Sequence, residues 1–158
     1  MIRSASCEDA EAIRRLLDAA FGGTAESGLV DKLRASGELV LALVAEHGGH
    51  VTGYIAFSAL KSPEHALALA PFAVVPSRQR CGIGSRLIEE ALRRLRADGW
   101  RMVFVLGEPE YYGRFGFTTQ GAAGFDCEYA GPYFQALQLT ESPVAPASVV
   151  YSSAFADL

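Results

Sequence analysis

A short glycine-containing turn between two apolar segments has the residue types best suited to chemistry. It spans residues Gln79 to Gly84, directly after a strand-like run and directly before a helix-like one. A strand, a turn and a helix in this order leave backbone N–H groups unpaired at the helix N-terminus, where the helix dipole favours an anion. Gly82 and Gly84 let a ligand approach the backbone without an intervening Cβ atom, while Gln79 and Arg80 can fold over it. The turn therefore predicts a phosphate-type anion site.

The spacing of the two glycines distinguishes this turn from two common nucleotide-binding loops. The Walker loop has the pattern G-x-x-x-x-G-K-[ST], and the dinucleotide loop has G-x-G-x-x-G. Two glycines separated by one residue match neither pattern. A mononucleotide kinase and a Rossmann dehydrogenase are therefore both disfavoured.

Charge is distributed unevenly along the chain. The net charge of −4 disfavours nucleic acid as a partner, because neutralising phosphates requires an excess of Lys and Arg. The segment from Arg78 to Arg101, however, contains seven arginines and only three acidic residues, and no Lys or Arg follows Arg114. A compact anion is a reasonable ligand for this segment, although solvated helix faces often have such clusters.

Length and composition favour one domain. The chain has 158 residues, of which 50% are hydrophobic and 20% charged. This length is sufficient for one core and too short for two ordinary domains, so residues 1–158 are expected to form a single domain. The longest apolar run, Ala66 to Pro76, is shorter than the roughly 18–20 residues that span a bilayer, and the N-terminus lacks a signal-peptide core. We therefore expect a cytoplasmic protein with no membrane partner.

The cysteines provide no sign of a metal site or a disulfide framework. They are three in number, at Cys7, Cys81 and Cys127, and lack the spacing of metal-binding motifs. Cys81 lies in the turn, where we interpret it as a tolerated loop residue rather than a nucleophile. No metal is expected.

The elements that must position the turn alternate between strands and helices. Their types follow from the period of the apolar residues and from the glycines and prolines at their ends. The predicted order is a strand at 2–4, helices at 10–21 and from 29 to near 37, a hairpin of 39–45 and 51–60, a strand at 67–75, a helix at 82–98, a strand at 102–106, a short helix from 109, and further strands that include 133–139. The strand at 67–75 is apolar at successive positions, which predicts burial on both faces at the centre of a sheet.

Two motifs in this order resemble those of the GNAT superfamily of CoA-dependent N-acyltransferases. The run from Phe72 to Pro76, followed by Gln79 to Leu87, is similar to the acyl-CoA motif of that family, with its Q/R-x-x-G-x-G/A signature. The run from Tyr112 to Phe117 resembles the family's Tyr-x-x-x-Gly-Phe motif. The longer string from Gly107 to Phe117 is similar to the YhbS-like subgroup of bacterial N-acetyltransferases, and the resemblance extends over residues 1–139.

The resemblance implies an α/β fold, α+β in some schemes, with a mixed and splayed central β-sheet flanked by helices. The strand before the turn diverges from its neighbour, and the pantetheine of acetyl-CoA takes the place of the missing strand pairing. Acetyl-CoA is thus the implied co-substrate. Its implied contacts are the backbone of Phe72, Ala73 and Val74 and the turn residues Gln79, Arg80, Cys81, Gly82, Ile83, Gly84 and Ser85, whose N–H groups from Arg80 onward hold the pyrophosphate.

The implied reaction is direct attack of a neutral amine on the thioester. It requires an acid for the departing thiolate and a donor for the oxyanion. The resemblance assigns Tyr112 as the acid and the Val74 N–H as the oxyanion donor, and we interpret the adjacent Tyr111 as a packing residue. Many relatives have a Glu base on the central strand, where this chain has no carboxylate. Glu108, Glu26 and solvent remain the candidates for the base.

Several alternatives remain open at this stage. The chain could bind acyl-CoA as a non-catalytic sensor, or it could transfer longer acyl groups. The acceptor could be a small-molecule amine or a protein amine, and the protein a monomer or a homodimer. Phe21, Phe57, Phe125 and Tyr133 are candidates for lining an acceptor pocket, although core packing explains most of them.

Overall fold

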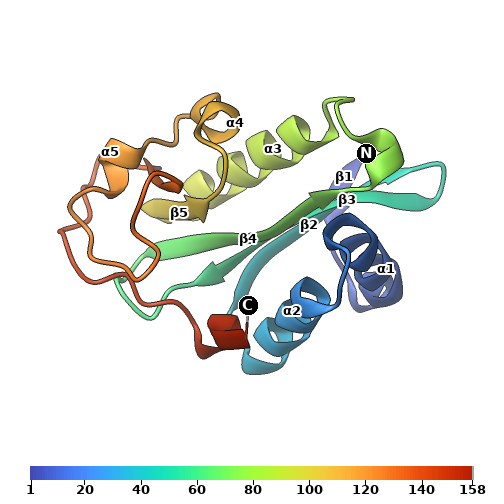
Figure 1. The fold of residues 1–158 in the computed structure, drawn as a ribbon. Coiled ribbons are helices and arrows are strands. Elements are labelled where there is room, and N and C mark those ends of the chain that lie inside the picture. Colours follow the sequence, from blue (N-terminus) through green and yellow to red (C-terminus); the bar gives the residue numbers. More distant parts are fainter. Residues whose placement is uncertain (158) are drawn as a thin grey trace.

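A six-stranded sheet forms the centre of the computed structural model, which describes residues 1–157 (Figure 1). Spatial order follows chain order in β1 (Ile2–Ser4), β2 (Leu39–His47), β3 (His50–Ala59), β4 (Ala66–Val74), β5 (Met102–Leu106) and β6 (Phe134–Gln138). Neighbouring strands are antiparallel except β4 and β5, which are parallel. The predicted mixed sheet is therefore confirmed.

Helices cover both faces of the sheet (Figure 1). The helices α1 (Ala10–Phe21) and α2 (Ala25–Ser36) lie on one face, and α3 (Ile83–Ala97) lies on the other. Gly22 and Gly37 end α1 and α2 with left-handed backbones, as glycines commonly do after a helix. The shorter elements are η1 (Cys7–Asp9), η2 (Pro76–Arg78), α4 (Pro109–Gly113), α5 (Thr119–Ala122) and η3 (Ser153–Asp157). Within residues 1–157, no helix is both long and apolar enough to cross a membrane.

A bulge in β4 changes which side chains face α3. Ala70 and Pro71 together lie opposite Ala56 of β3, so β4 has one residue more than its partner here. The extra residue shifts the alternation by one, and Phe72 therefore packs on the same α3-facing core as Leu69. The bulge thus aims Phe72 at the start of α3.

The strands β4 and β5 pair along only part of their length. Residues 66–68 of β4 pair with residues 102–104 of β5, and the pairing stops there. The strand β5 continues to Leu106 alongside β6, while β4 continues to Val74 alongside β3. The bulge bends β4, and Pro71 has no N–H to offer a neighbouring strand. This partial pairing is the splayed sheet that the resemblance implies.

Element boundaries differ little from the predicted ones except after Phe117. The strand predicted at 67–75 is β4, which is shifted by one residue. The helix predicted at 82–98 is α3, with Gly82 and Asp98 as its caps. Of the further strands predicted after the short helix, the one at 133–139 is present as β6, whereas residues 118–133 contain no strand of that kind. The Thr118 hydroxyl accepts a hydrogen bond from the Gly121 N–H at 2.9 Å, which caps the short helix α5. Strand pairing there is limited to an isolated bridge between Thr118 and Ala136, before β6 begins at 134.

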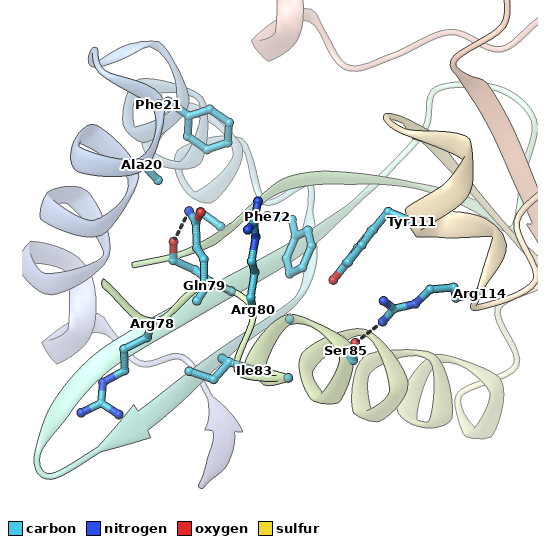
Figure 2. A pocket seen from close by; sticks show the side chains of 14 residues that line it. Ala20, Phe21, Phe72, Arg78, Gln79, Arg80, Ile83, Ser85, Tyr111 and Arg114 are labelled. Atoms are coloured by element: carbon cyan, nitrogen blue, oxygen red, sulfur yellow. Dashed lines mark hydrogen bonds between the residues drawn. The ribbon is translucent and has the colours of Figure 1, made fainter. Parts of the chain in front are cut away.

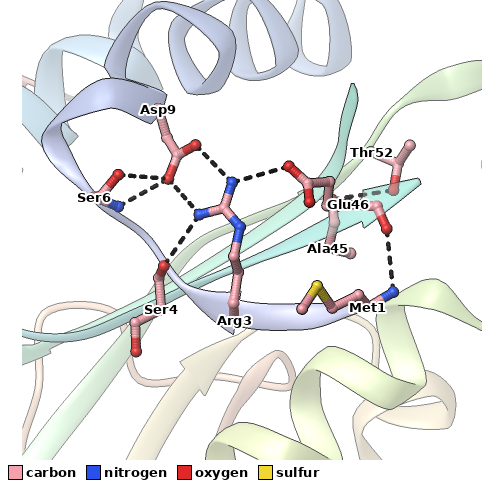
Figure 3. Close-up of polar contacts among 8 residues, drawn as sticks. All are labelled: Met1, Arg3, Ser4, Ser6, Asp9, Ala45, Glu46 and Thr52. Atoms are coloured by element: carbon pink, nitrogen blue, oxygen red, sulfur yellow. Dashed lines mark hydrogen bonds and ion pairs between the residues drawn. The ribbon is translucent and has the colours of Figure 1, made fainter. Parts of the chain in front are cut away.

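An arginine network anchors the N-terminal strand (Figure 3). The Arg3 guanidinium donates to both carboxylate oxygens of Asp9, at 2.8 and 2.9 Å, and to Glu46 at 3.1 Å. The Asp9 carboxylate also accepts from the Ser6 N–H at 2.8 Å. The bonds from Arg3, followed by those from Ser6, hold the pKa of the Asp9 carboxyl well below its ordinary value, although burial opposes this. The network thus ties β1 to η1 and β2.

We expect this network to make stability depend on acid pH. A carboxyl whose pKa is lowered by folding stabilises the protein above its unfolded pKa of about 3.9, and this contribution is lost as the pH falls through the folded pKa. Urea unfolding between pH 7 and pH 2 should therefore show stability decreasing below about pH 5. Asp9→Asn should be less stable at pH 7 and lose less stability in acid.

Asp31→Asn is the matched control, because Asp31 forms a half-exposed ion pair with Arg14 at 3.2 Å. Exposed pairs contribute little, so this variant should keep the acid dependence of the parent protein. An equal flattening of the pH dependence in both variants would contradict the role given to Asp9.

Candidate functional site

A cavity of about 610 Å³ lies where α1, β4, α3 and α4 converge (Figure 2). Its walls come from the end of α1, the unpaired end of β4, the turn after η2, the start of α3, and α4. The lining residues are Ala20, Phe21, Phe72, Ala73, Val74, Arg78, Gln79, Arg80, Gly82, Ile83, Gly84, Ser85, Tyr111 and Arg114. The structure thus brings together nearly all the residues that the sequence places around a ligand.

The backbone of the turn is shaped as an anion cradle. Arg80 and Gly82 both have left-handed backbones, with φ angles of 67° and 83°. A left-handed backbone is uncommon for a residue with a side chain, and such backbones concentrate at functional sites. Gly82 is the N-cap of α3, and no side chain caps this helix end. The N–H groups of the first turn, beginning at Ile83, are therefore free to bind an anion.

The end of β4 presents its backbone to the same cavity. The Val75 N–H donates to Thr52 of β3 at 2.8 Å. Because N–H groups along a strand alternate in direction, the Val74 N–H points to the opposite edge, where β5 no longer pairs. The Gln79 amide donates to the Val74 carbonyl at 3.1 Å, which ties the turn to this strand end. Gln79 thus braces the wall of the cavity that it also lines.

Aromatic rings close the side of the cavity next to α4. The rings of Phe72 and Tyr111 stack with their centroids 6.2 Å apart. The Arg114 guanidinium lies 5.0 Å from the centroid of the Tyr111 ring and donates to the Ser85 hydroxyl at 2.6 Å. Burial raises the pKa of Tyr111, while Arg114 and Ser85 oppose this rise. The side chain of Arg114 therefore connects α4 to α3 at the rim of the cavity (Figure 2).

Tyr112 does not line this cavity, and its ring packs edge-on against the ring of Tyr111. Its ring contacts Phe117 and Phe72 edge-on, with centroids 5.8 and 6.5 Å away, and occupies the space that a Cβ atom would need at Gly107. Burial, and secondarily Tyr111, raises the pKa of Tyr112 well above its ordinary value. Its hydroxyl has no hydrogen-bond partner among residues 1–157 and keeps some exposure to solvent. The Tyr112 hydroxyl is thus protonated, partnerless and not fully enclosed.

The candidate bases lie outside the cavity. Glu108 is exposed at the N-cap of α4, directly after the end of β5, and Glu26 lies in the first turn of α2. Cys81, which the sequence placed among the CoA contacts, is exposed and does not line this cavity. Within residues 1–157, no cluster of three or more His, Cys, Asp or Glu side chains could hold a metal ion.

The aromatic residues suggested for an acceptor pocket have different positions. Phe57 and Phe125 are buried in the core, Tyr133 is exposed, and Phe21 lines the cavity. The lining residues that the sequence reasoning did not place in the site are Ala20, Arg78, Tyr111 and Arg114. A sequence signal existed for Tyr111 and Arg114. They are three positions apart at the end of a short helical segment, a spacing that puts side chains on one face, and this was the available signal.

Comparisons with known proteins agree with this arrangement. The sequence profile described as "Acetyltransferase (GNAT) family" matches residues 10–117. The chain is 39% identical over 133 residues to the uncharacterized N-acetyltransferase YjhQ of Escherichia coli K12, covering 79% of this chain and 71% of that protein. It is 37% identical over 127 residues to the uncharacterized N-acetyltransferase YhbS of the same strain, covering 78% and 76%.

Solved structures provide a second comparison. The crystal structure of the E. coli GNAT family N-acetyltransferase YhbS in complex with CoA has a TM-score of 0.91 at 33% identity, covering 99% of this chain and 91% of that one. A GNAT family acetyltransferase from Brucella melitensis in complex with acetyl-CoA has a TM-score of 0.84 at 38% identity, covering 98% and 97%. The similarity thus extends over nearly the whole chain.

A larger side chain at Gly84 should obstruct the cradle. A Cβ atom there would lie 2.7 Å from the Tyr111 hydroxyl and 2.9 Å from Cζ of Phe72, inside the cavity wall. We expect Gly84→Val to weaken binding of CoA, the ligand that the sequence resemblance implies, by about tenfold or more. Leaving polar backbone groups unpaired costs about 1–3 kcal/mol, and tenfold corresponds to about 1.4 kcal/mol.

Isothermal titration calorimetry on the folded variants measures this effect. Gly28→Val is the matched control, because a Cβ atom at Gly28 in α2 meets nothing within 4 Å. The control should bind CoA like the parent protein. Unchanged affinity in folded Gly84→Val would remove this turn from the ligand site.

Proposed function

Because the chain belongs to the acetyltransferase (GNAT) family, we propose that it transfers the acetyl group of acetyl-CoA to a primary amine by direct attack, with Tyr112 as the general acid. The YhbS-like resemblance of the sequence is confirmed by the relatives. One observation supports the proposal most directly. The unpaired edge of β4 and the uncapped N-terminus of α3 face the same cavity, so strand-type and anion-type contacts are available to one elongated ligand.

The residues present fit acetyl-CoA, which supplies a thioester carbonyl and a thiolate leaving group. The free N–H groups of the turn and of the first turn of α3 suit a pyrophosphate, and Arg80 adds positive charge beside them. Gly84 has no side chain, which leaves room for Phe72 and Tyr111 to pack against the start of α3 and form the cavity wall. The backbone of Phe72 to Val74 provides the free strand edge that the pantetheine would follow.

In the proposed mechanism, Val74 and Tyr112 act on different atoms of the thioester. The Val74 N–H, directed into the split between the strands, donates to the oxygen on which negative charge develops. The Tyr112 hydroxyl donates its proton to the departing sulfur. A raised pKa keeps this hydroxyl protonated at neutral pH, as an acid must be before the step.

The base must act from outside the cavity, because none of the described residues that line it is a carboxylate. We propose Glu108, which lies two residues after the end of β5 at the N-cap of α4, as a base that removes the amine proton through solvent. The same lack of a lining carboxylate favours a second candidate function, a sensor that binds acyl-CoA without transferring it. Release of free thiol from acetyl-CoA in the presence of an amine library distinguishes the two functions.

Replacing Tyr112 by Phe tests the acid. The substitution keeps the ring and its packing but removes the proton, so kcat should fall while affinity for acetyl-CoA stays near that of the parent. General acid catalysis is worth about 10²–10⁴-fold, and the lower end is expected because a thiolate leaves readily.

Tyr111→Phe is the matched control for this measurement. Adjacent helical residues point about 100° apart. The Tyr111 ring therefore lines the cavity, whereas the Tyr112 ring lies over Gly107. We expect a much smaller decrease in kcat for this variant. Full activity of Tyr112→Phe would refute the assignment, and a loss confined to Tyr111→Phe would transfer the role to Tyr111.

Replacing Glu108 by Gln tests the base. The variant should lower kcat at neutral pH and flatten the acidic side of the pH–rate profile, because a general base must be deprotonated to act. Glu110→Gln, an exposed carboxylate two residues further along in the first turn of α4, should leave both kcat and the pH–rate profile unchanged. Identical pH profiles for Glu108→Gln and the parent would assign proton removal to solvent alone.

A further inference from the structure

A second, smaller cavity lies farther along the unpaired edge of β4. It has a volume of about 220 Å³ and is lined by Leu69, Ala70, Leu106, Tyr129, Tyr151 and Phe155, which we call the aromatic pocket. Leu69 and Ala70 follow the last β4 residue that pairs with β5, and Leu106 is the last residue of β5. The aromatic pocket therefore opens at the split between the two strands, as the first cavity does.

The two cavities share no lining residue, although both are lined by residues of β4. Phe72 of the first cavity packs in the core beneath α3. Ala70, Tyr151 and Phe155 of the aromatic pocket belong to the core on the α2 side. Two residues of extended strand span only about 7 Å, so the distance along β4 from Phe72 to Ala70 is short. A reacting carbonyl held near the split would thus be reachable from the aromatic pocket.

The walls of the aromatic pocket are apolar and carry no charged side chain. Tyr129 and Tyr151 meet edge-to-face with centroids 5.1 Å apart, and Tyr151 and Phe155 do the same at 5.0 Å. Burial raises the pKa of both tyrosines, so their hydroxyls stay neutral at physiological pH. The remaining lining side chains are aliphatic. Such a pocket favours a flat apolar group, because edge-to-face contacts between aromatic rings add to the stabilisation that comes from burying apolar surface.

We infer that the aromatic pocket holds the acceptor, and that the acceptor is a monoamine whose amino group is attached to a small aromatic ring by a short chain. This inference rests on the proposed function and specifies its substrate class. A polyamine or an amino sugar would bring further ammonium groups into a pocket whose lining has no charged side chain, where each would be desolvated and unpaired. A single amino group can instead lie at the mouth, toward the split.

The same environment helps to generate the nucleophile. Desolvation disfavours an ammonium ion and lowers its pKa, so an amine at this mouth loses its proton more readily than in water. The amine nitrogen then forms a bond to the thioester carbon, and the carbon–sulfur bond breaks. The departing sulfur takes the Tyr112 proton, the excess amine proton passes through solvent to Glu108, and Tyr112 is reprotonated from solvent. This environment reduces the demand on a base that lies outside the cavity.

Leu106 offers a test at low risk to folding, because its side chain is 43% exposed at the rim of the aromatic pocket. Isothermal titration calorimetry on the CoA-loaded protein should show that 2-phenylethylamine binds and that spermidine binds at least tenfold more weakly. Leu106→Trp should block the pocket and weaken 2-phenylethylamine binding by tenfold or more. Leu106→Lys provides an independent test, since a cation at the same place should also weaken binding of the charged amine.

Val40→Trp is the matched control, because Val40 is a similarly exposed aliphatic residue on β2 that lines neither cavity. It should leave amine binding unchanged, and all three variants should bind CoA like the parent protein. Equal or tighter binding of spermidine, or unchanged 2-phenylethylamine binding in both Leu106 variants, would overturn the inference.

Turnover separates this inference from the proposed function. If 2-phenylethylamine binds in a Leu106-dependent way but is never acetylated, the aromatic pocket binds the inferred class of amine and the proposed transfer fails. If spermidine is acetylated and the Leu106 variants are fully active on it, transfer stands and the inference fails. If Leu106→Trp impairs the use of hexanoyl-CoA while amine binding is unchanged, the pocket holds an acyl chain, which also overturns the inference.

Discussion

The incomplete pairing of β4 with β5 is the constraint on which the site depends. Backbone N–H and C=O groups at a sheet edge require partners, and a central strand normally finds them on both sides. Here the bulge at Ala70 and Pro71 separates β4 from β5 after three residue pairs. The strand therefore has β3 on one side and a cavity on the other. The Val74 N–H is available to a ligand only because this partner strand is missing.

The elements around the split provide the anion-binding N–H groups and the aromatic side chains that a strand edge lacks. The turn after β4 reverses the chain so that α3 begins beside the strand end, with free N–H groups facing the cavity. Across the split, β5 ends at Leu106, and Pro109 starts α4 almost at once, which positions the two adjacent tyrosines. Helical geometry then directs Tyr111 to the cavity wall and Tyr112 to the space over Gly107. One short helix thus provides both a wall and the proposed acid.

Much of this arrangement was predictable from local sequence, and the exceptions have physical reasons. Periodicity and glycine ends located α1, α2 and α3, because these helices bury one regular face. The turn was predictable because its glycines are adjacent in sequence to the strand and helix that they join. The segment after Phe117 was not, since the cap provided by Thr118 competes there with strand pairing.

The aromatic pocket was beyond sequence reasoning for a different reason. Tyr129 and Tyr151 are far apart in the chain, and Leu106 and Ala70 are residues of ordinary strands until the split is known. Only the tertiary fold shows that these side chains meet. The same holds for the link from Arg114 to Ser85, which joins two helices across 29 positions of sequence.

The left-handed backbones of Arg80 and Gly82, together with the bond from Gln79 to the Val74 carbonyl, have a consequence for ligand exchange. The conformational entropy of ordering this loop is lost when the chain folds rather than when a ligand arrives. A cradle formed in advance needs no rearrangement to receive one molecule after another. Exchange of one ligand molecule for the next therefore requires no reordering of this loop.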